Sequence, residues 1–121
     1  MPVVGYDDGM STLPGPAPGA MTLPALLHAL GDPVRLELVR RTSADAEMTC
    51  SADGLDVPKS TLSNHWRILR EAGLITVTID GRRRRIRLRS ADIESRFPGL
   101  LNTVLRAADA EKAAAALPSQ R

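Results

Sequence analysis

The chain has 121 residues, of which 43% are hydrophobic and 25% charged, as in one small globular domain, and this excludes a multidomain enzyme within it. Its single cysteine, Cys50, cannot form an intrachain disulfide, and no basic leader or membrane-spanning apolar run is present, so we expect a cytoplasmic protein. The net charge of +2 hides an asymmetry, because residues 59–89 contain nine Lys and Arg against two Asp and Glu. Such a basic cluster is typical of a surface that binds a polyanion.

The first half of the chain predicts a tail followed by two helices. Residues 1–20 are rich in proline and glycine without apolar periodicity, so we expect a disordered tail and a folded domain over 21–116. Four leucines at helical spacing, from Leu23 to Leu30, predict a first helix. Gly31 ends it, and Asp32-Pro33 begins a second helix with a capping carboxylate and a proline at its first position.

Residues 43–58 are ambiguous, and we predict a short helix over Met48–Asp53 followed by a turn. The next helix is clearer. Pro58 can start it, Leu62, Trp66 and Leu69 recur on one side, and Gly73 supplies a C-terminal stop.

A β-hairpin follows, because apolar residues alternate over 75–79 and again at Ile86 and Leu88, with Asp80-Gly81 between them. A four-residue loop over 80–83 would pair Val77 with Ile86, whereas a two-residue Asp80-Gly81 turn would place arginines opposite apolar residues. We favour the longer loop because it matches more apolar partners. In either register, alternating arginines from 83 to 89 lie on the face opposite Ile86, which we expect to be the solvent face.

The end of the chain predicts a short helical stretch after Ser90, a break near Phe97-Pro98, a final helix into the alanine-rich 113–116, and a frayed end over 117–121. The whole order predicts a mainly α fold with a small β-hairpin, as in a winged helix-turn-helix domain.

The helix over 58–72 has an apolar side and a polar side, and small hydroxyls, an amide and a guanidinium on the polar side suit a DNA major groove. The arginine hairpin beside it could hold the phosphate backbone and reach the minor groove. We therefore predict binding of double-stranded DNA through Lys59, Ser60, Thr61, Ser63, Asn64, Arg67, Arg82, Arg83, Arg85 and Arg87.

Three segments, ALGDPVRLELVR, STLSNHWRILREAGLI and IDGRRRRIRLR, resemble the ArsR-type (ArsR/SmtB) family of winged helix-turn-helix transcriptional regulators, over about residues 22–108. The resemblance implies a homodimer through the first and last helices that binds a pseudo-palindromic operator near a promoter. The apolar stripes of these two helices agree with that expectation. The predicted dimer contacts are Leu23, Leu26, Leu27, Leu30, Leu100, Leu101, Val104 and Leu105.

Many relatives in this family are metal sensors, and here the sequence departs from their pattern. The usual CxC pair is replaced by EMTCSADG with Cys50 alone, and the final helix has Asp109 and Glu111 without histidine. A weak nickel- or zinc-type site for a divalent transition metal, formed by His28 and a partner's Asp109 or Glu111, is the remaining metal hypothesis. Cys50 is a further weak candidate, as a metal ligand or redox switch, but we favour its interpretation as a small structural residue. We also interpret His65 as a structural residue, and Arg35 as a structural arginine that pairs with a carboxylate.

The sequence thus predicts a sequence-specific DNA-binding regulator that acts as a dimer, is not an enzyme, and more simply represses by steric occlusion than activates. Two alternatives stay open. A partner protein could supply effector sensing to a DNA-binding regulator, which could then be an activator. Alternatively, the winged helix could be a protein-interaction module whose arginines bind an acidic protein.

Overall fold

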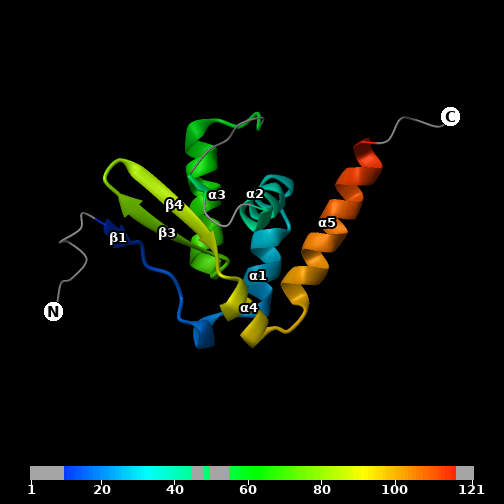
Figure 1. The fold of residues 1–121 in the computed structure, drawn as a ribbon, viewed down its shortest axis with the longest axis horizontal. Coiled ribbons are helices and arrows are strands. Elements are labelled where there is room, and N and C mark those ends of the chain that lie inside the picture. Colours follow the sequence, from blue (N-terminus) through cyan, green and yellow to red (C-terminus); the bar gives the residue numbers. More distant parts are fainter. Residues whose placement is uncertain (1–9, 45–47, 50–54, 117–121) are drawn as a thin grey trace.

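The computed structural model of the protein describes residues 10–44, 48–49 and 55–116. Helices lie before and after a small antiparallel sheet, in the order predicted for a winged helix-turn-helix domain (Figure 1). The elements are β1 (Met10–Thr12), η1 (Pro18–Ala20), α1 (Leu23–Leu30), α2 (Pro33–Ala44), β2 (Met48–Thr49), α3 (Lys59–Ala72), β3 (Ile75–Asp80), β4 (Arg83–Leu88), α4 (Ser90–Arg96) and α5 (Leu100–Ala116).

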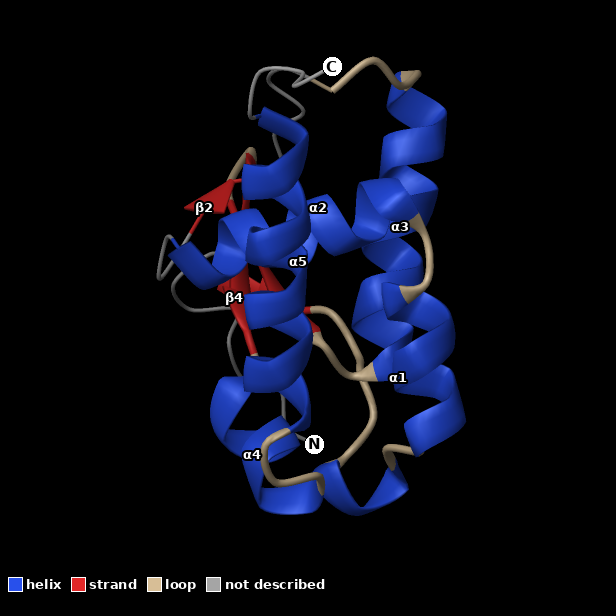
Figure 2. Ribbon diagram, turned by 90° about the vertical axis from the view of Figure 1, so that its right-hand side faces the viewer, coloured by secondary structure: helices blue, strands red, loops and turns tan. Residues whose placement is uncertain are grey.

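The core lies where α1, α2 and α3 meet one face of the sheet, and α5 runs along the outside of this body (Figures 1 and 2). Leu26 of α1, Leu38 of α2, Leu69 of α3 and Ile86 of β4 are each 0% exposed. Each is an apolar residue on the inward face of its element, so packing of these faces supplies the hydrophobic stabilisation. None of the described helices is both long and apolar enough to cross a membrane.

The sheet has the strand order β1-β3-β4-β2 and is antiparallel throughout. The predicted hairpin register is confirmed, because Val77 pairs with Ile86 and Ile75 with Leu88. Pairing extends to Asp80 and Arg83, so the turn itself contains two residues, and Gly81 adopts a φ of 63° that favours glycine. Matching of apolar pairs therefore identified the register, although the strands continue one pair further than the predicted four-residue loop.

Two sequence predictions about secondary structure are wrong. Within residues 10–20, expected in a disordered tail, Met10–Thr12 form β1 and Pro18–Ala20 form η1. Residues 48–49, expected in a short helix, form β2 beside β4. Both short strands complete their hydrogen bonds with β3 or β4, distant in sequence, so local periodicity gives no signal for them. The rest of the predicted tail (1–9) and helix (50–53), and the predicted frayed end, lie outside the described residues.

Residues 10–21 form a strap that joins the sheet to the end of α3. The Leu13 backbone N–H donates to the Val77 carbonyl at 2.9 Å, and the Arg89 Nη1 donates to the Pro16 carbonyl at 2.8 Å. Met21, 1% exposed, packs against Gly73, where an added Cβ would lie 3.0 Å from the Met21 side chain. Gly73 also has a φ of 99° at the C-cap of α3, so both its conformation and its close contact require glycine.

Glu37 links α2 to α5 through three cations. Its carboxylate accepts from Arg40 at 3.0 Å, from Arg41 at 2.9 Å and from Lys112 of α5 at 3.2 Å. The hydrogen bond from Arg40, with those from Arg41 and Lys112, lowers the pKa of Glu37 from 4.5 to about 2 despite its partial burial. Because the folded-state pKa is below the unfolded value, the stabilisation is complete above about pH 4.5 and is lost as the pH falls toward 2.

We therefore expect Glu37→Gln to lower the free energy of unfolding at pH 7 by on the order of 1 kcal/mol, allowing for solvent screening. The difference from the parent should shrink between pH 4.5 and pH 2. Urea denaturation at pH 7, 4 and 3 measures this. Glu111→Gln is the matched control, because the Glu111 carboxylate, on α5, forms no ion pair with a described residue. Equal pH dependence in both variants would contradict the assignment.

Candidate nucleic-acid interface

Helix α3 places its apolar and polar residues on two different sides, as predicted. Pro58 is its N-cap residue and Gly73 its C-cap residue, so it begins and ends close to the predicted positions. Leu62, Trp66 and Leu69 are 8%, 5% and 0% exposed and anchor one side in the core. The other side is exposed along its whole length and carries Lys59, Ser60, Thr61, Ser63, Asn64 and Arg67.

Asn64 and Arg67 interact with each other on this exposed side. The Arg67 guanidinium donates to the Asn64 side-chain oxygen and also pairs with the Glu71 carboxylate at 3.1 Å. The Arg67 and Glu71 side chains are 51% and 54% exposed, so these contacts are screened by water and weak. Base edges can therefore replace these contacts to the Asn64 amide and the Arg67 guanidinium at little cost in free energy.

Buried Arg35 fixes α3 against the turn between α1 and α2. Its guanidinium donates to the carbonyls of Ala29 at 2.8 Å and His28 at 3.2 Å, and it lies 3.2 Å from His65 Nδ1 of α3. The prediction of a structural arginine is therefore confirmed, but its hydrogen-bond acceptors are carbonyls and an imidazole rather than a carboxylate. His65, with its side chain 12% exposed, is the structural histidine that we predicted.

The nearby carboxylate, Asp32, caps α2. Its Oδ2 accepts from the backbone N–H groups of Val34 at 2.9 Å and Arg35 at 3.1 Å. Partial burial opposes ionisation, but these backbone hydrogen bonds, with help from His65 and Arg35, hold the pKa of Asp32 below its ordinary value. The charged cap and the Arg35 contacts together keep the helix pair beneath α3 in one geometry.

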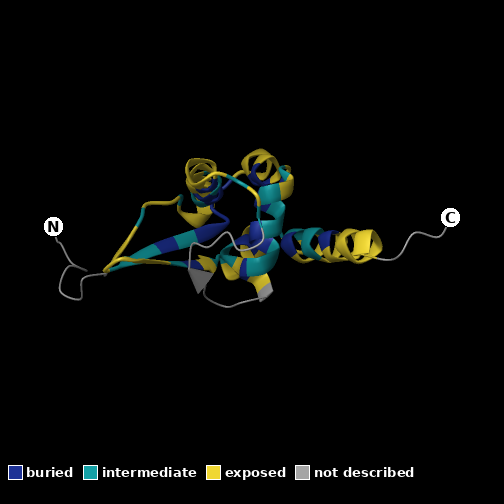
Figure 3. Cartoon of the chain, turned by 90° about the horizontal axis from the view of Figure 1, so that it is seen from above, coloured by how far each residue is buried: buried dark blue, intermediate teal, exposed yellow. Residues whose placement is uncertain are grey.

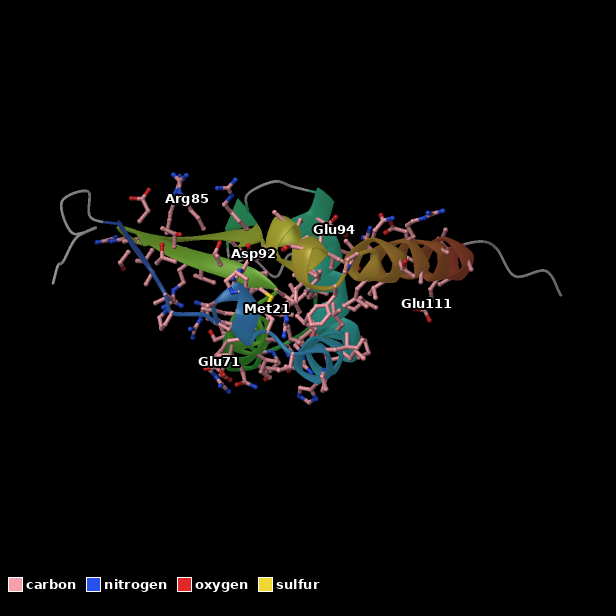
Figure 4. The ribbon with its side chains drawn as sticks, turned by 90° about the horizontal axis from the view of Figure 1, so that it is seen from below. Met21, Glu71, Arg85, Asp92, Glu94 and Glu111 are labelled. Atoms are coloured by element: carbon pink, nitrogen blue, oxygen red, sulfur yellow. The ribbon has the colours of Figure 1, made fainter. Side chains whose placement is uncertain are left out.

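The hairpin arginines lie on two faces rather than one. Arg82 and Arg83 are exposed at the tip, and Arg84 is exposed on the face that carries Ile86, toward α3. Arg85 lies on the opposite face of the sheet from α3 and Glu71, as Figure 4 shows, and pairs with Asp80 at 3.3 Å. By strand alternation Arg87 shares the face of Arg85.

Arg89, which we expected on the solvent face, is not there. Its side chain is 10% exposed, and it pairs with Asp92 at 3.0 Å while donating to the strap. The even alternation of arginines in the sequence gave no indication that the last one binds the N-terminal residues, because that contact joins positions far apart in the chain.

Two basic residues, one on α3 and one on β4, were missed by the sequence analysis. Arg84 and Arg70 line a groove of about 490 Å³ between α3 and the sheet, together with Lys59 and Arg67. Arg70 also donates to the Pro14 carbonyl of the strap. The alternation of Arg84 with Ile86 placed it on the inner face, and that signal could have identified it.

The weak metal candidates are not brought together within the described chain. Asp109 pairs with Arg40 at 3.4 Å, and His28 and Glu111 are exposed. No three His, Cys, Asp or Glu side chains cluster at metal-binding distance among the described residues. Cys50 lies outside the described residues.

The apolar residues predicted for a dimer contact divide into three groups by their exposure. Leu26, Leu30 and Leu101 are 0%, 7% and 6% exposed, so they are buried within the single chain and are not available to a partner. Leu23 and Leu27 are 40% and 48% exposed. Leu100, Val104 and Leu105 of α5 are half-buried, and the outer part of α5 is exposed over most of its length (Figure 3).

Comparisons with known proteins agree with this geometry. A helix-turn-helix domain family matches residues 30–78, which include α2, α3 and most of β3. The chain is 33% identical over 82 residues to YceK, an uncharacterized HTH-type transcriptional regulator of Bacillus subtilis (strain 168), covering 65% of this chain and 82% of that protein. It is also similar to the crystal structure of an ArsR family transcriptional regulator, with a TM-score of 0.55 and 25% identity over 75% of this chain and 86% of that one. The chain therefore belongs to the ArsR-type family of helix-turn-helix regulators and is a DNA-binding transcriptional regulator.

Proposed function

We propose that this regulator is a homodimeric repressor that binds a pseudo-palindromic operator and blocks polymerase by occupying the promoter. The exposed polar side of α3, held by a buried apolar side and flanked by a basic hairpin, is the observation that carries the proposal. A small DNA-binding domain can most simply regulate a promoter by blocking access of polymerase.

Within α3, the residues have different roles. Asn64 reads adenine through its amide, and Arg67 reads guanine O6 and N7, because these side chains match those base edges bidentately. Ser60 and Ser63 are small and let the helix approach the major-groove floor. Lys59 and Thr61, near the helix N-terminus, bind phosphate and fix the register without specifying sequence.

The tip of the hairpin supplies the second set of contacts. Arg82 and Arg83 are exposed and form no ion pair with a described residue, so their charge is free to neutralise phosphates or enter a narrow minor groove. Arg84 faces the α3 side and adds charge between the two elements. Arg85, in contrast, must leave Asp80 before it can contribute.

The apolar side chains that α1 and α5 leave exposed to solvent support the proposed dimer. Leu23 and Leu27 are the exposed large apolar residues of the described chain, and they lie one helical turn apart on α1. Pairing this patch and the half-buried leucines of α5 across a two-fold axis would remove them from water. It would also set two α3 helices about one DNA turn, roughly 34 Å, apart.

The test begins with selection of bound oligonucleotides by the full chain and measurement of affinity for the selected site from 50 to 300 mM salt. We expect Arg82→Ala with Arg83→Ala to weaken binding to all duplexes and to reduce the log–log salt slope by about one unit per lost phosphate contact. Arg106→Ala, which removes one exposed arginine from α5, is the control and should change neither the affinity for duplex nor the salt slope. Transcription in vitro from a promoter that carries the selected site then measures the sign of regulation.

Two outcomes would contradict the proposal. A selection that yields no preferred sequence, with weak binding to every duplex, would favour the protein-interaction alternative. Stimulated transcription would contradict the repressor role and leave DNA binding intact.

A further inference from the structure

The groove between α3 and the sheet has a floor that is apolar and a size that suits a small organic molecule. Its volume of about 490 Å³ lies within the range of ligand pockets. Leu62 and Trp66 of α3 and Val77 of β3 form much of the floor, and Leu13 of the strap and Val57 add to it. DNA phosphates and bases offer little that would cover such a surface, so the floor needs another explanation.

Trp66 adds a second feature to this floor. Its side chain is 5% exposed overall, and its Nε1–H is buried without a hydrogen-bond acceptor among the described residues. An unpaired buried donor costs about 1–3 kcal/mol, so native proteins rarely leave one without a partner. The site therefore has an unsatisfied donor beneath an apolar groove.

The rim of the groove is positive. Lys59, Arg67, Arg70 and Arg84 line it, and no carboxylate of the described residues does. Arg67 and Arg70 have partners, but Lys59 and Arg84 make no hydrogen bond or ion pair within the described chain. These two cations come from different elements, α3 and β4, and stand beside the same apolar floor.

We propose that this groove binds a small organic anion with an apolar body and one carboxylate. The body covers Trp66, Leu62 and Val77, and the carboxylate pairs with Lys59 and Arg84. Charge complementarity selects the anion over a neutral molecule, because Lys59 and Arg84 have no acidic partner among the described residues and the apolar floor reduces solvent screening.

Occupancy of the groove also opposes DNA binding. Lys59, Ser63 and Arg67 line the groove and belong to the exposed side of α3 that we assign to DNA. An anion there neutralises the charge that phosphates need and blocks entry of α3 into the major groove. This regulatory part rests on the proposed function, whereas the binding site itself does not.

The binding test uses Trp66, the single tryptophan of the chain, as its reporter. The full chain without DNA is titrated with 4-phenylbutyrate and with octanoate while tryptophan emission is recorded. We expect a saturable change with a dissociation constant on the order of 0.1–1 mM, as suits a ligand of about twelve non-hydrogen atoms. The uncharged 4-phenylbutanol should bind at least ~5-fold more weakly.

Arg84→Gln locates the site. Arg84 is exposed, so its replacement should not affect folding. We expect Arg84→Gln to weaken binding of 4-phenylbutyrate about 5- to 10-fold and to leave the affinity for 4-phenylbutanol unchanged. Arg106→Gln removes the same charge from α5 and should leave the affinity for both probes as in the parent chain. Failure of both carboxylates to change the emission, equal binding of acid and alcohol, or equal effects of the two variants would each overturn the site.

A competition experiment tests the regulatory part separately. Labelled selected duplex is titrated with 4-phenylbutyrate against an equal concentration of sodium chloride. At ten times the probe's own dissociation constant, the apparent DNA dissociation constant should rise about tenfold. Saturable emission changes without loss of DNA binding would overturn the competition and keep the site. Failure of the chain to bind any duplex would overturn the proposed function and leave the emission titration as it stands.

Discussion

Replacing Asn64 with alanine should lower affinity for the selected operator by roughly 5- to 150-fold, because one bidentate base contact contributes about 1–3 kcal/mol of discrimination. Affinity for random duplex should stay within about twofold, since a neutral amide adds little to phosphate binding. Asn64 is exposed on α3, and alanine favours helix more than asparagine, so the loss cannot come from unfolding. Arg67→Ala should relax the base preference at a different position of the operator and should also weaken binding to random duplex.

Fluorescence anisotropy with the selected duplex, its single-base variants and a random duplex measures these effects. Asn102→Ala is the matched control, because Asn102 is an exposed asparagine of α5 that makes no side-chain hydrogen bond with any described residue. If Asn64→Ala weakened binding to random duplex as strongly as binding to the operator, Asn64 would position the protein on DNA rather than read a base.

The second large effect concerns α1. We expect Leu27→Glu with Leu23→Glu to convert a dimer into a folded monomer and to reduce operator affinity by about 10²- to 10⁴-fold, since the second half-site is no longer bound intramolecularly. Both residues are exposed in the single chain, whereas Leu26 and Leu30 of the same helix anchor it in the core. The fold should therefore survive the added charge.

Sedimentation velocity measures the oligomeric state, and binding to a full site and a half-site measures the consequence for DNA. Ala91→Glu places one carboxylate at an exposed position of α4 and should leave both unchanged. If the double variant were still a dimer, the assignment of the dimer interface to α1 would be wrong. If the parent chain were monomeric and still bound the full site tightly, the proposal that a dimer binds the operator would be wrong.

The helices and the hairpin could be predicted because their signals are local. Caps such as Asp32 and stops such as Gly73 act within a few residues, and the alternation around Val77 and Ile86 admits one register that buries both. The exposed side of α3 was predictable for the same reason, since its residues are fixed once Leu62, Trp66 and Leu69 face the core.

Other features depended on contacts between distant segments. The strap has no periodicity, and its hydrogen bonds to Val77 and Arg89 involve residues more than sixty positions away. The division of the α1 leucines into buried and exposed pairs likewise needed α2 and α3 in place, because an apolar stripe does not say which neighbour covers it.

By itself, the sequence determined a helix with an apolar side and an exposed polar side, a basic hairpin in one register, and a resemblance that the comparisons confirmed. Only the tertiary structure decided that Arg89 binds the strap and that a basic-rimmed apolar groove lies between α3 and the sheet. The reason is physical: backbone periodicity fixes the direction of a side chain on its own element, whereas packing of elements across long chain separations fixes what that side chain meets.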